Sequence, residues 1–162
     1  MTLDFTSSMD KLFSTTLETP VGRIFLVQRG QYLVRAGWGN ADTEDDTELL
    51  DQAKGQLQAY FAGQFKRFDL PLAYSCSDFQ KLACEEMLRI PHGETITYAE
   101  LATRLDSSAQ AAGNACGGNP LPIIVPCHRV LGSNNLGGYS GRGGIETKVA
   151  LLKMESSIPW LI

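Results

Sequence analysis

Cys127, His128 and Arg129 form the segment of this chain with the clearest capacity for chemistry. A cysteine thiolate is a soft nucleophile, and it needs a neighbouring group that takes its proton or lowers its pKa. The imidazole of His128 is a candidate for that base. Adjacent side chains of an extended segment point to opposite faces, so we expect a relay from Cys127 to His128 to pass through a water molecule or a turn.

The pair belongs to an octet, residues 123–130, in which an apolar run is followed by Pro126. The run at 123–125 predicts a strand, and the Asn and Gly residues at 134–138 predict a turn that folds the chain back across the pair. An isolated Cys-His pair is more often structural than catalytic. The prediction of chemistry therefore rests on the whole octet and its flanks.

Composition and length exclude several classes of protein. The chain has 162 residues, 43% of them hydrophobic and 20% charged, which indicates one globular domain or two small ones. No apolar run approaches the roughly 20 residues of a membrane span, and residues 1–11 lack the pattern of a signal peptide. We therefore expect a cytoplasmic protein without a membrane partner. The four cysteines and two histidines lack the spacing of a zinc site, so neither a metal nor another cofactor is expected.

The charge distribution is uneven. The net charge is −4, with seven basic and ten acidic residues in 1–74 and seven basic and eight acidic residues in 75–162. Between residues 107 and 140 the one formal charge is Arg129. A surface built from that segment would neither repel a polyanion nor attract it strongly.

The first half of the chain predicts a small sheet and a helix. Alternating apolar residues predict an antiparallel meander with strands at about 13–19, 24–27 and 32–38. A helix is expected from about 47 to 61, and we interpret the acidic run that precedes it as its solvated, capped start. Residues 68–74, which include Pro71, are expected to form an extended linker.

The second half predicts helices. The capping-box pattern, in which a Ser or Thr is followed three residues later by Glu or Gln, occurs at Ser77–Gln80, Thr97–Glu100 and Ser107–Gln110. The short connection at Asp106 gives helix-turn-helix spacing, although plain helical hairpins share it. A last helix is expected from about 145 to 156.

Through these residues the chain resembles the O6-alkylguanine-DNA alkyltransferases of the bacterial type, also called methylated-DNA–protein-cysteine methyltransferases. The resemblance depends most on the Pro126–Val130 signature between Asn119 and Tyr139, and it covers most of the chain. It implies an α/β N-terminal domain over residues 1–74, RNase H-like, with a small antiparallel sheet and a helix. A mostly α C-terminal domain with a helix-turn-helix would follow over residues 75–162.

The family activity that this implies is DNA repair by a single-turnover S-methyltransferase. The alkyl group of O6-alkylguanine, and of O4-alkylthymine, in double-stranded DNA would pass irreversibly and stoichiometrically to Cys127. The helix-turn-helix would enter the minor groove while the damaged base is flipped into the protein. The resemblance also implies a monomer that is nucleoid-associated when bound to DNA.

The resemblance implies a role for each matching residue. Cys127 would accept the alkyl group, His128 would deprotonate it through a water molecule, and Glu155 would orient His128. Asn119 would hold the active-site turn by hydrogen bonds, and Tyr98 would assist protonation of the leaving guanine and press on the rotated phosphate. The base pocket would be lined by Val130, Tyr139 and Ser140. DNA contacts would come from Tyr98, Ser108, Ala109, Gln110, Ala111 and Gly113, whereas Arg129 would brace the fold.

Two departures from the family pattern concern DNA binding. Gln110 stands where the family usually has the arginine that fills the space of the flipped base, and it also fits a capping box with Ser107. Gly117-Gly118 stands where a basic residue usually precedes Asn119. These changes predict weaker base flipping and a shallow salt dependence of DNA binding.

Three other functions stay open at this point. A non-catalytic, lesion-binding relative is favoured by Gln110 but opposed by Cys127, because Trp or Ala usually replaces the cysteine there. A cysteine hydrolase would require direct contact between Cys127 and His128, together with an oxyanion hole that we cannot place. A helix-turn-helix regulator would leave the octet unexplained.

Overall fold

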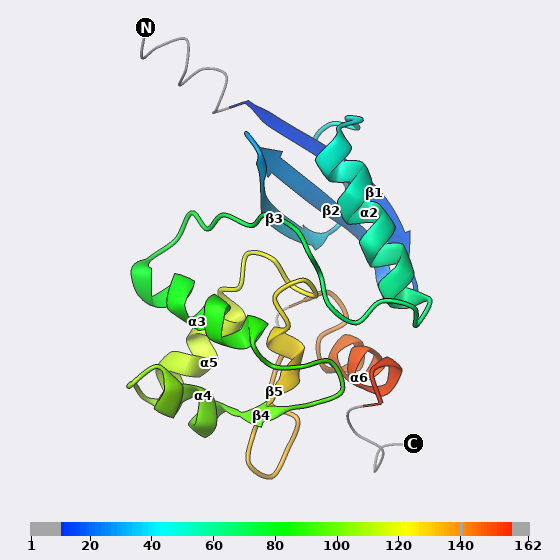
Figure 1. The fold of residues 1–162 in the computed structure, drawn as a ribbon. Coiled ribbons are helices and arrows are strands. Elements are labelled where there is room, and N and C mark those ends of the chain that lie inside the picture. Colours follow the sequence, from blue (N-terminus) through cyan, green and yellow to red (C-terminus); the bar gives the residue numbers. More distant parts are fainter. Residues whose placement is uncertain (1–10, 140, 157–162) are drawn as a thin grey trace, which may run out of the picture. The chain divides into compact units, whose positions relative to one another are not determined.

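The computed structural model describes residues 11–139 and 141–156. Contacts within the chain divide it into two compact units between Ser75 and Cys76, and each unit is described by itself. Figure 1 shows the sheet of the first unit and the helices of the second. In the described ranges no helix is long and apolar enough to cross a membrane.

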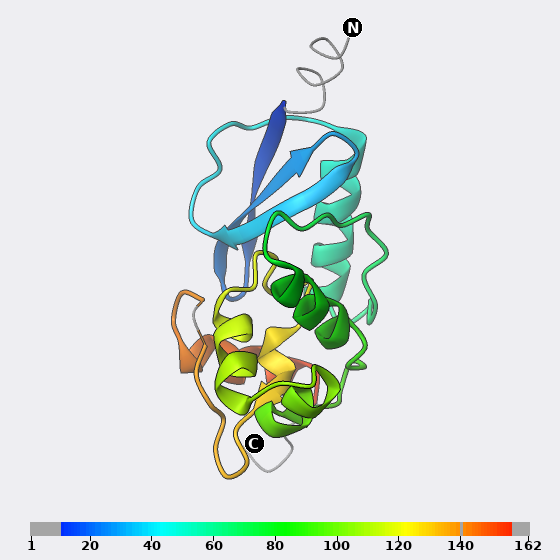
Figure 2. The same ribbon diagram turned by 90° about the vertical axis from the view of Figure 1, so that its left-hand side faces the viewer.

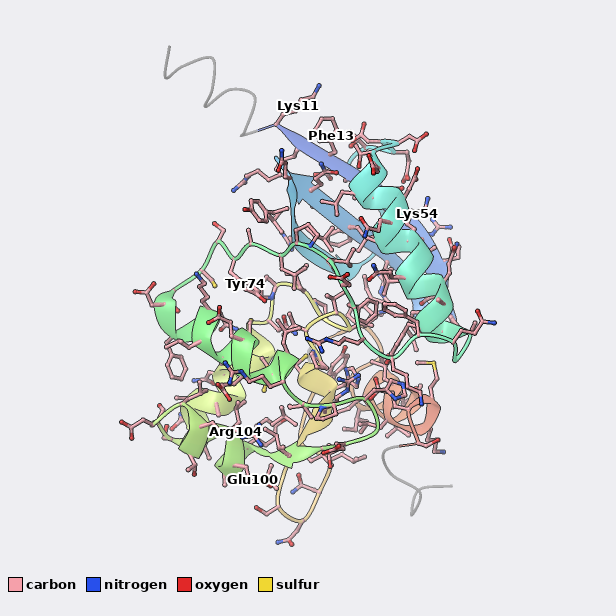
Figure 3. The ribbon with its side chains drawn as sticks, in the orientation of Figure 1. Lys11, Phe13, Lys54, Tyr74, Glu100 and Arg104 are labelled. Carbon is pink, nitrogen blue, oxygen red and sulfur yellow. The ribbon has the colours of Figure 1, made fainter. Side chains whose placement is uncertain are left out.

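The first unit contains a three-stranded antiparallel sheet and one described helix. The elements are β1 (Leu12–Thr19), β2 (Gly22–Arg29), β3 (Tyr32–Trp38) and α2 (Glu48–Phe61). The strand order is β1-β2-β3, which confirms the predicted meander. Helix α2 lies on one face of the sheet (Figure 1) and buries Leu50, Ala53, Leu57 and Tyr60. Lys54 of α2 reaches the hydroxyl of Thr15 in β1 at 3.5 Å (Figure 3).

The acidic run before α2 has a function beyond the helix start that the sequence predicted. Thr47 caps α2 by accepting a hydrogen bond from the Leu50 amide at 3.0 Å. The carboxylates of Glu44 and Asp45 instead accept hydrogen bonds from the backbone amides of Thr16 and Ser14, each at 2.9 Å. These bonds satisfy amides along the outer edge of β1, which protects an edge strand from pairing with another chain.

Residues 68–74 are extended but are more than a linker. The Leu33 amide donates to the Pro71 carbonyl at 2.8 Å, and the Ala73 amide donates to the Leu33 carbonyl at 3.1 Å. This parallel bridge between Leu33 and Leu72 fastens the segment to β3. The sequence could not show this because the pairing joins residues far apart in the chain.

The second unit is mostly helical. Its elements are α3 (Asp78–Leu88), β4 (Ile96–Thr97), α4 (Tyr98–Arg104), α5 (Ala109–Gly117), the 3-10 turn η1 (Cys127–Arg129), β5 (Val130–Leu131) and α6 (Ile145–Met154). The short strands β4 and β5 pair in parallel. In Figure 2 the turn η1 lies behind α3 and α5, which places the candidate cysteine among the helices of this unit.

The three expected capping boxes differ in the structure. The box at Thr97 and Glu100 is complete, and Glu100 lies with Arg104 on α4 (Figure 3). Ser77 caps α3, but the Gln80 side chain donates to the Ala115 carbonyl at 2.8 Å instead of returning to the cap.

The third predicted box is wrong. The N-cap of α5 is Ser108, which accepts a hydrogen bond from the Ala111 amide at 3.1 Å, and not Ser107. Two successive serines offer equivalent caps in the sequence, and the structure uses the second, two residues after Asp106, whose φ is +52°. Gln110 therefore lies one position too early to close a box, and its side chain is exposed.

Candidate active site

The residues before Cys127 form a clamped turn and not the predicted strand. Asn119 donates through Nδ2 to the Val125 carbonyl at 2.8 Å and accepts from the Leu121 amide through Oδ1 at 2.9 Å. The Val125 amide donates to the Leu121 carbonyl at 2.8 Å. Ile123 has a φ of +74° although it is β-branched, a conformation that costs on the order of 1–3 kcal/mol. Burial of Ile123 and the Asn119 bonds hold this strained backbone in place.

Cys127 begins the turn η1 and is almost fully buried, with 5% of its surface exposed. Burial raises the pKa of the Cys127 thiol, whereas a hydrogen bond with Asn119 and the charge of Lys148 lower it. Two neighbours thus favour the thiolate in a site from which water is largely excluded. In the part of the chain that the structure describes, Cys84 and Cys116 are also buried and Cys76 is exposed.

His128 is completely buried and is joined to the last helix. Its Nε2 lies 2.8 Å from Oε2 of Glu155, the C-cap of α6. Burial lowers the pKa of His128, so the ring is neutral near pH 7 and donates its Nε2 proton to the carboxylate. The other nitrogen, Nδ1, is buried and has no hydrogen-bond partner among the described residues. That lone pair is the one able to accept a proton.

Arg129 fixes the position of the Glu155 carboxylate. Its Nε donates to Oε1 at 2.8 Å and its Nη2 donates to Oε2 at 3.0 Å, while Nη1 donates to the Ile90 carbonyl at 2.7 Å. Burial alone would raise the pKa of Glu155, but the bonds from His128 and Arg129 outweigh it and hold the pKa well below its usual range. The expectation that Arg129 braces the fold is confirmed by these contacts.

Lys148 is a component of the site that sequence reasoning missed. The residue is fully buried, and its Nζ donates to the carbonyls of Val130 at 2.7 Å and Gly138 at 3.0 Å. Burial lowers the pKa of Lys148 to about 8, and the charge of Cys127 opposes that shift. The spacing of Lys148 with Leu151, Leu152 and Glu155 on one helical face was the available signal.

Tyr98 lies between α5 and the loop that follows β5. Its hydroxyl accepts a hydrogen bond from Lys148 Nζ at 3.4 Å. A side chain at Gly137 would meet the Tyr98 ring at 2.6 Å, and one at Gly113 would meet it at 4.0 Å. The absence of a side chain at Gly137 lets the ring lie close to that backbone, whereas a Cβ at Gly113 would make an ordinary van der Waals contact.

The remaining candidates divide between the base pocket and α5. Val130 is fully buried, and Tyr139 is partly buried with its pKa raised by burial and by the charge of Cys127. Ser140 lies outside the described residues. On α5, Ala109 and Gln110 are exposed, and Ala111 and Gly113 are partly exposed.

Helix α5 carries no formal charge. The structure therefore brings Asn119, His128 and Lys148 into the surroundings of Cys127 and presents a neutral helix of small side chains on the surface. In the described ranges no group of three or more His, Cys, Asp or Glu residues is arranged to hold a metal ion.

Comparisons with known proteins relate the chain to one family. A family profile for the DNA binding domain of 6-O-methylguanine DNA methyltransferase matches residues 78–157, and one for its ribonuclease-like domain matches residues 12–74. The constitutive methylated-DNA–protein-cysteine methyltransferase of Bacillus subtilis is 38% identical over 157 residues, covering 88% of this chain and 94% of that protein. The Methanosarcina acetivorans protein of the same activity is also 38% identical, covering 90% and 99% of the two chains.

The chain is also similar to a solved structure. The crystal structure of Mycobacterium tuberculosis OGT in complex with DNA is similar to this chain with a TM-score of 0.80 and 39% sequence identity. The match covers 89% of this chain and 92% of that one.

Proposed function

This chain belongs to the 6-O-methylguanine DNA methyltransferase family, and from that premise we propose that it repairs DNA by moving the alkyl group of O6-alkylguanine to the sulfur of Cys127. The observation that carries the proposal is the buried set formed by Cys127, His128 and Glu155, in which Nε2 of His128 is bonded to Glu155 and Nδ1 is left able to accept a proton. O4-alkylthymine, which presents the same kind of O-alkyl bond, is the second substrate of the proposal.

The first step is activation of the thiol. His128 keeps its Nε2 proton and donates a hydrogen bond with it to Glu155, so Nδ1 is the nitrogen without a proton. Nδ1 therefore receives the proton of Cys127, through a bridging water molecule. The Glu155 carboxylate stabilises the imidazolium that results, as in other sets of nucleophile, base and orienting group. Arg129 keeps that carboxylate in place and ionised.

The second step is in-line displacement. The Cys127 thiolate attacks the alkyl carbon, a C–S bond forms, and the C–O bond breaks with its electron pair passing to the guanine. In the proposal the leaving guanine takes a proton from Tyr98, whose hydroxyl accepts a hydrogen bond from Lys148. Lys148 replaces the proton of Tyr98, and the proton that His128 took from Cys127 returns through water, so the whole reaction neither gains nor loses a proton. The thioether is stable, so each molecule acts once.

DNA would reach the site through helix α5. We propose that α5 enters the minor groove and that the damaged base is flipped toward Cys127, with Gln110 at the exposed start of the helix. The small residues of α5 support a close approach of its backbone to DNA. The protein would act as a monomer and, when bound to DNA, on the nucleoid.

The alternative functions lack this support. The relatives named above are methyltransferases by description, not non-catalytic binding proteins. A cysteine hydrolase would need the Cys127 thiol to bond directly to His128, yet His128 Nδ1 has no partner in the described part of the chain.

The test is the stoichiometry of repair. Duplex DNA that contains O6-methylguanine should lose one lesion for each protein molecule and then no more. The Cys127→Ala protein should bind the lesion without removing it, whereas Cys116→Ala, a second buried cysteine, should repair to the same plateau. Repair by Cys127→Ala, or turnover well beyond one lesion for each molecule, would contradict the proposal.

A further inference from the structure

The face of the β1-β2-β3 sheet that points away from α2 carries aromatic and arginine side chains. In β2 the residues at 24, 26 and 28 are buried under α2, and the alternate residues point the other way. The register with β3 adds its exposed side chains to the same face. The side chains that the argument uses are Phe25, Arg29, Tyr32 and Arg35. We call this set the open sheet face.

Phe25 lies flat on the open sheet face. A Cβ on Gly37 would come within 2.8 Å of the Phe25 ring, so the ring occupies the space above the glycine of the neighbouring strand. The Arg35 guanidinium lies 5.6 Å from the centroid of the same ring. The result is a planar aromatic group with a planar cation beside it, a pairing that is attractive in itself.

Arg29 and Arg35 form no ion pair within the described part of the chain, whereas their neighbour Arg23 does. Arg23 is paired with Glu18 and also bonds Asn40 at 2.8 Å. Arg29 and Arg35 are both exposed. Val27 pairs with Arg35 and Arg29 pairs with Tyr32, so Arg29 and Arg35 lie on adjacent strands on the same face, with a register shift at Val27/Gln28 between them.

Acidic and basic side chains lie on different sides of the sheet. The carboxylates of Glu44 and Asp45 lie along the outer edge of β1, where they bond backbone amides. The unpaired cations lie on β2 and β3. Tyr32, 49% exposed, is the register partner of Arg29 and extends the aromatic surface along that side.

We propose that the open sheet face binds single-stranded nucleic acid along β2 and β3, with bases stacked on Phe25, Tyr32 and the Arg35 guanidinium and with phosphates on Arg29 and Arg35. Exposed bases stack on aromatic and guanidinium planes, and a duplex hides its bases from such a surface. The unpaired arginines complement a polyanion, whereas the acidic edge at β1 repels it. This binding is separate from the transfer of the alkyl group and gives the first unit a contact with nucleic acid that helix α5, which has no charge, does not supply.

The first test measures binding of a fluorescent oligo(dT) strand to the full chain by anisotropy over a range of salt concentrations. The Arg29→Ala/Arg35→Ala protein should bind about fivefold to tenfold more weakly at low salt. The slope of the logarithm of the binding constant against the logarithm of the salt concentration should become shallower by about 1.4. That is about 0.7 for each phosphate that an arginine no longer neutralises. Arg23→Ala is the matched control, since this arginine lies on the same side of the sheet but outside the open sheet face and is already neutralised by Glu18. It should bind nearly as the unaltered protein does.

A second measurement locates the strand. Ultraviolet cross-linking to an oligonucleotide that contains 5-bromodeoxyuridine should label peptides from residues 22–38. Unchanged affinity and slope in the double variant, with cross-links confined to residues 76–162, would overturn the inference. Self-association in sedimentation experiments without DNA, abolished by the double variant, would overturn it also and assign the face to a second copy of the chain.

The two proposals can fail separately. Repair of O6-methylguanine is measured by lesion loss on duplex DNA, and strand binding is measured on DNA without a lesion. Normal repair, together with unchanged strand binding by the Arg29→Ala/Arg35→Ala protein, would refute only the proposal for the open sheet face. Cross-links to residues 22–38 without repair would refute the alkyl transfer alone.

Discussion

At the scale of single residues, the reactivity of Cys127 depends on opposing effects. Burial raises the pKa of the thiol, and the Asn119 hydrogen bond and the Lys148 charge lower it. Lys148 itself has a pKa lowered by burial to about 8, so the ammonium is mostly charged at neutral pH. The buried ammonium of Lys148 therefore lowers the pKa of Cys127, and this effect is lost when Lys148 gives up its proton.

Replacing Lys148 by Met should make Cys127 less acidic. We expect the rate of reaction with free O6-benzylguanine to fall about tenfold at pH 7, which corresponds to a rise of about one unit in the pKa of the thiol. The rise of rate with pH should move to higher pH by the same amount. Lys153→Met, an exposed lysine of the same helix, is the control. A pH profile that matches the unaltered protein would show that Lys148 does not act on the thiol.

Replacing Arg129 by Leu should destabilise the protein. Arg129 and Glu155 form a buried pair, and removal of one partner from such a pair costs about 3–5 kcal/mol because the other charge is left uncompensated. Arg89→Leu removes an exposed arginine whose pair with Glu86 spans 3.8 Å, and it should cost about 0–1 kcal/mol. Urea unfolding of both variants measures the difference, and equal losses would refute this role of Arg129.

Residue types alone predicted only part of the site. Cys127 and His128 are conspicuous because they are rare and adjacent, and Glu155 followed from the family resemblance. Lys148 was missed because a lysine in an amphipathic helix is usually at the surface, and its burial depends on carbonyl groups of Val130 and Gly138 that come from distant parts of the chain.

At the scale of elements, the proposed approach to DNA depends on helix α5. Gln110 lies in its first turn, exposed and outside any capping box, so a substitution there changes the surface and not the cap. The same holds for Gly117, where an added Cβ would meet no atom within 4 Å.

Replacing Gln110 by Arg should speed repair of duplex DNA severalfold, because a longer cationic side chain fills the space of a flipped base more effectively and is attracted to DNA. The reaction with free O6-benzylguanine, which needs no flipping, should not change. The ratio of the two rate constants is the measurement. An equal effect on both substrates would contradict the assignment of Gln110 to base flipping.

The elements themselves were largely predictable, and the exceptions have physical causes. Alternation predicted the three strands, and cap patterns predicted three helix starts to within a residue or so. The run at 123–125 looked like a strand because it is apolar, but Asn119 clamps it into a turn with Ile123 at positive φ. No local pattern shows such a clamp, because it joins residues across the turn.

At the scale of the whole molecule, the buried set at the site links stability to pH. The pKa values of His128 and Glu155 are both lowered in the folded protein. The unfolded chain therefore binds more protons than the folded one below their usual pKa values, which are about 6.5 and 4.3. The stability from these groups is present above those values and is lost on acidification.

We expect the free energy of unfolding to fall first as the pH drops below about 6.5, through His128, and further below about 4.3, through Glu155. Urea titrations at a series of pH values measure this. The Glu155→Gln protein, less stable at pH 7, should show a shallower decline. A free energy of unfolding that stays constant from pH 7 to pH 4 would contradict the burial and pairing described for these two residues.

In the proposed repair reaction the alkyl group finishes on one particular sulfur atom, that of Cys127. After incubation with an equal amount of duplex DNA containing O6-methylguanine, digestion and mass spectrometry should find the mass of one CH₂ added to the peptide that contains Cys127. The peptides with Cys76, Cys84 and Cys116 should be unmodified and serve as internal controls. Loss of the lesion without added mass on the Cys127 peptide, or a methyl group on one of the other cysteines, would contradict the proposed transfer.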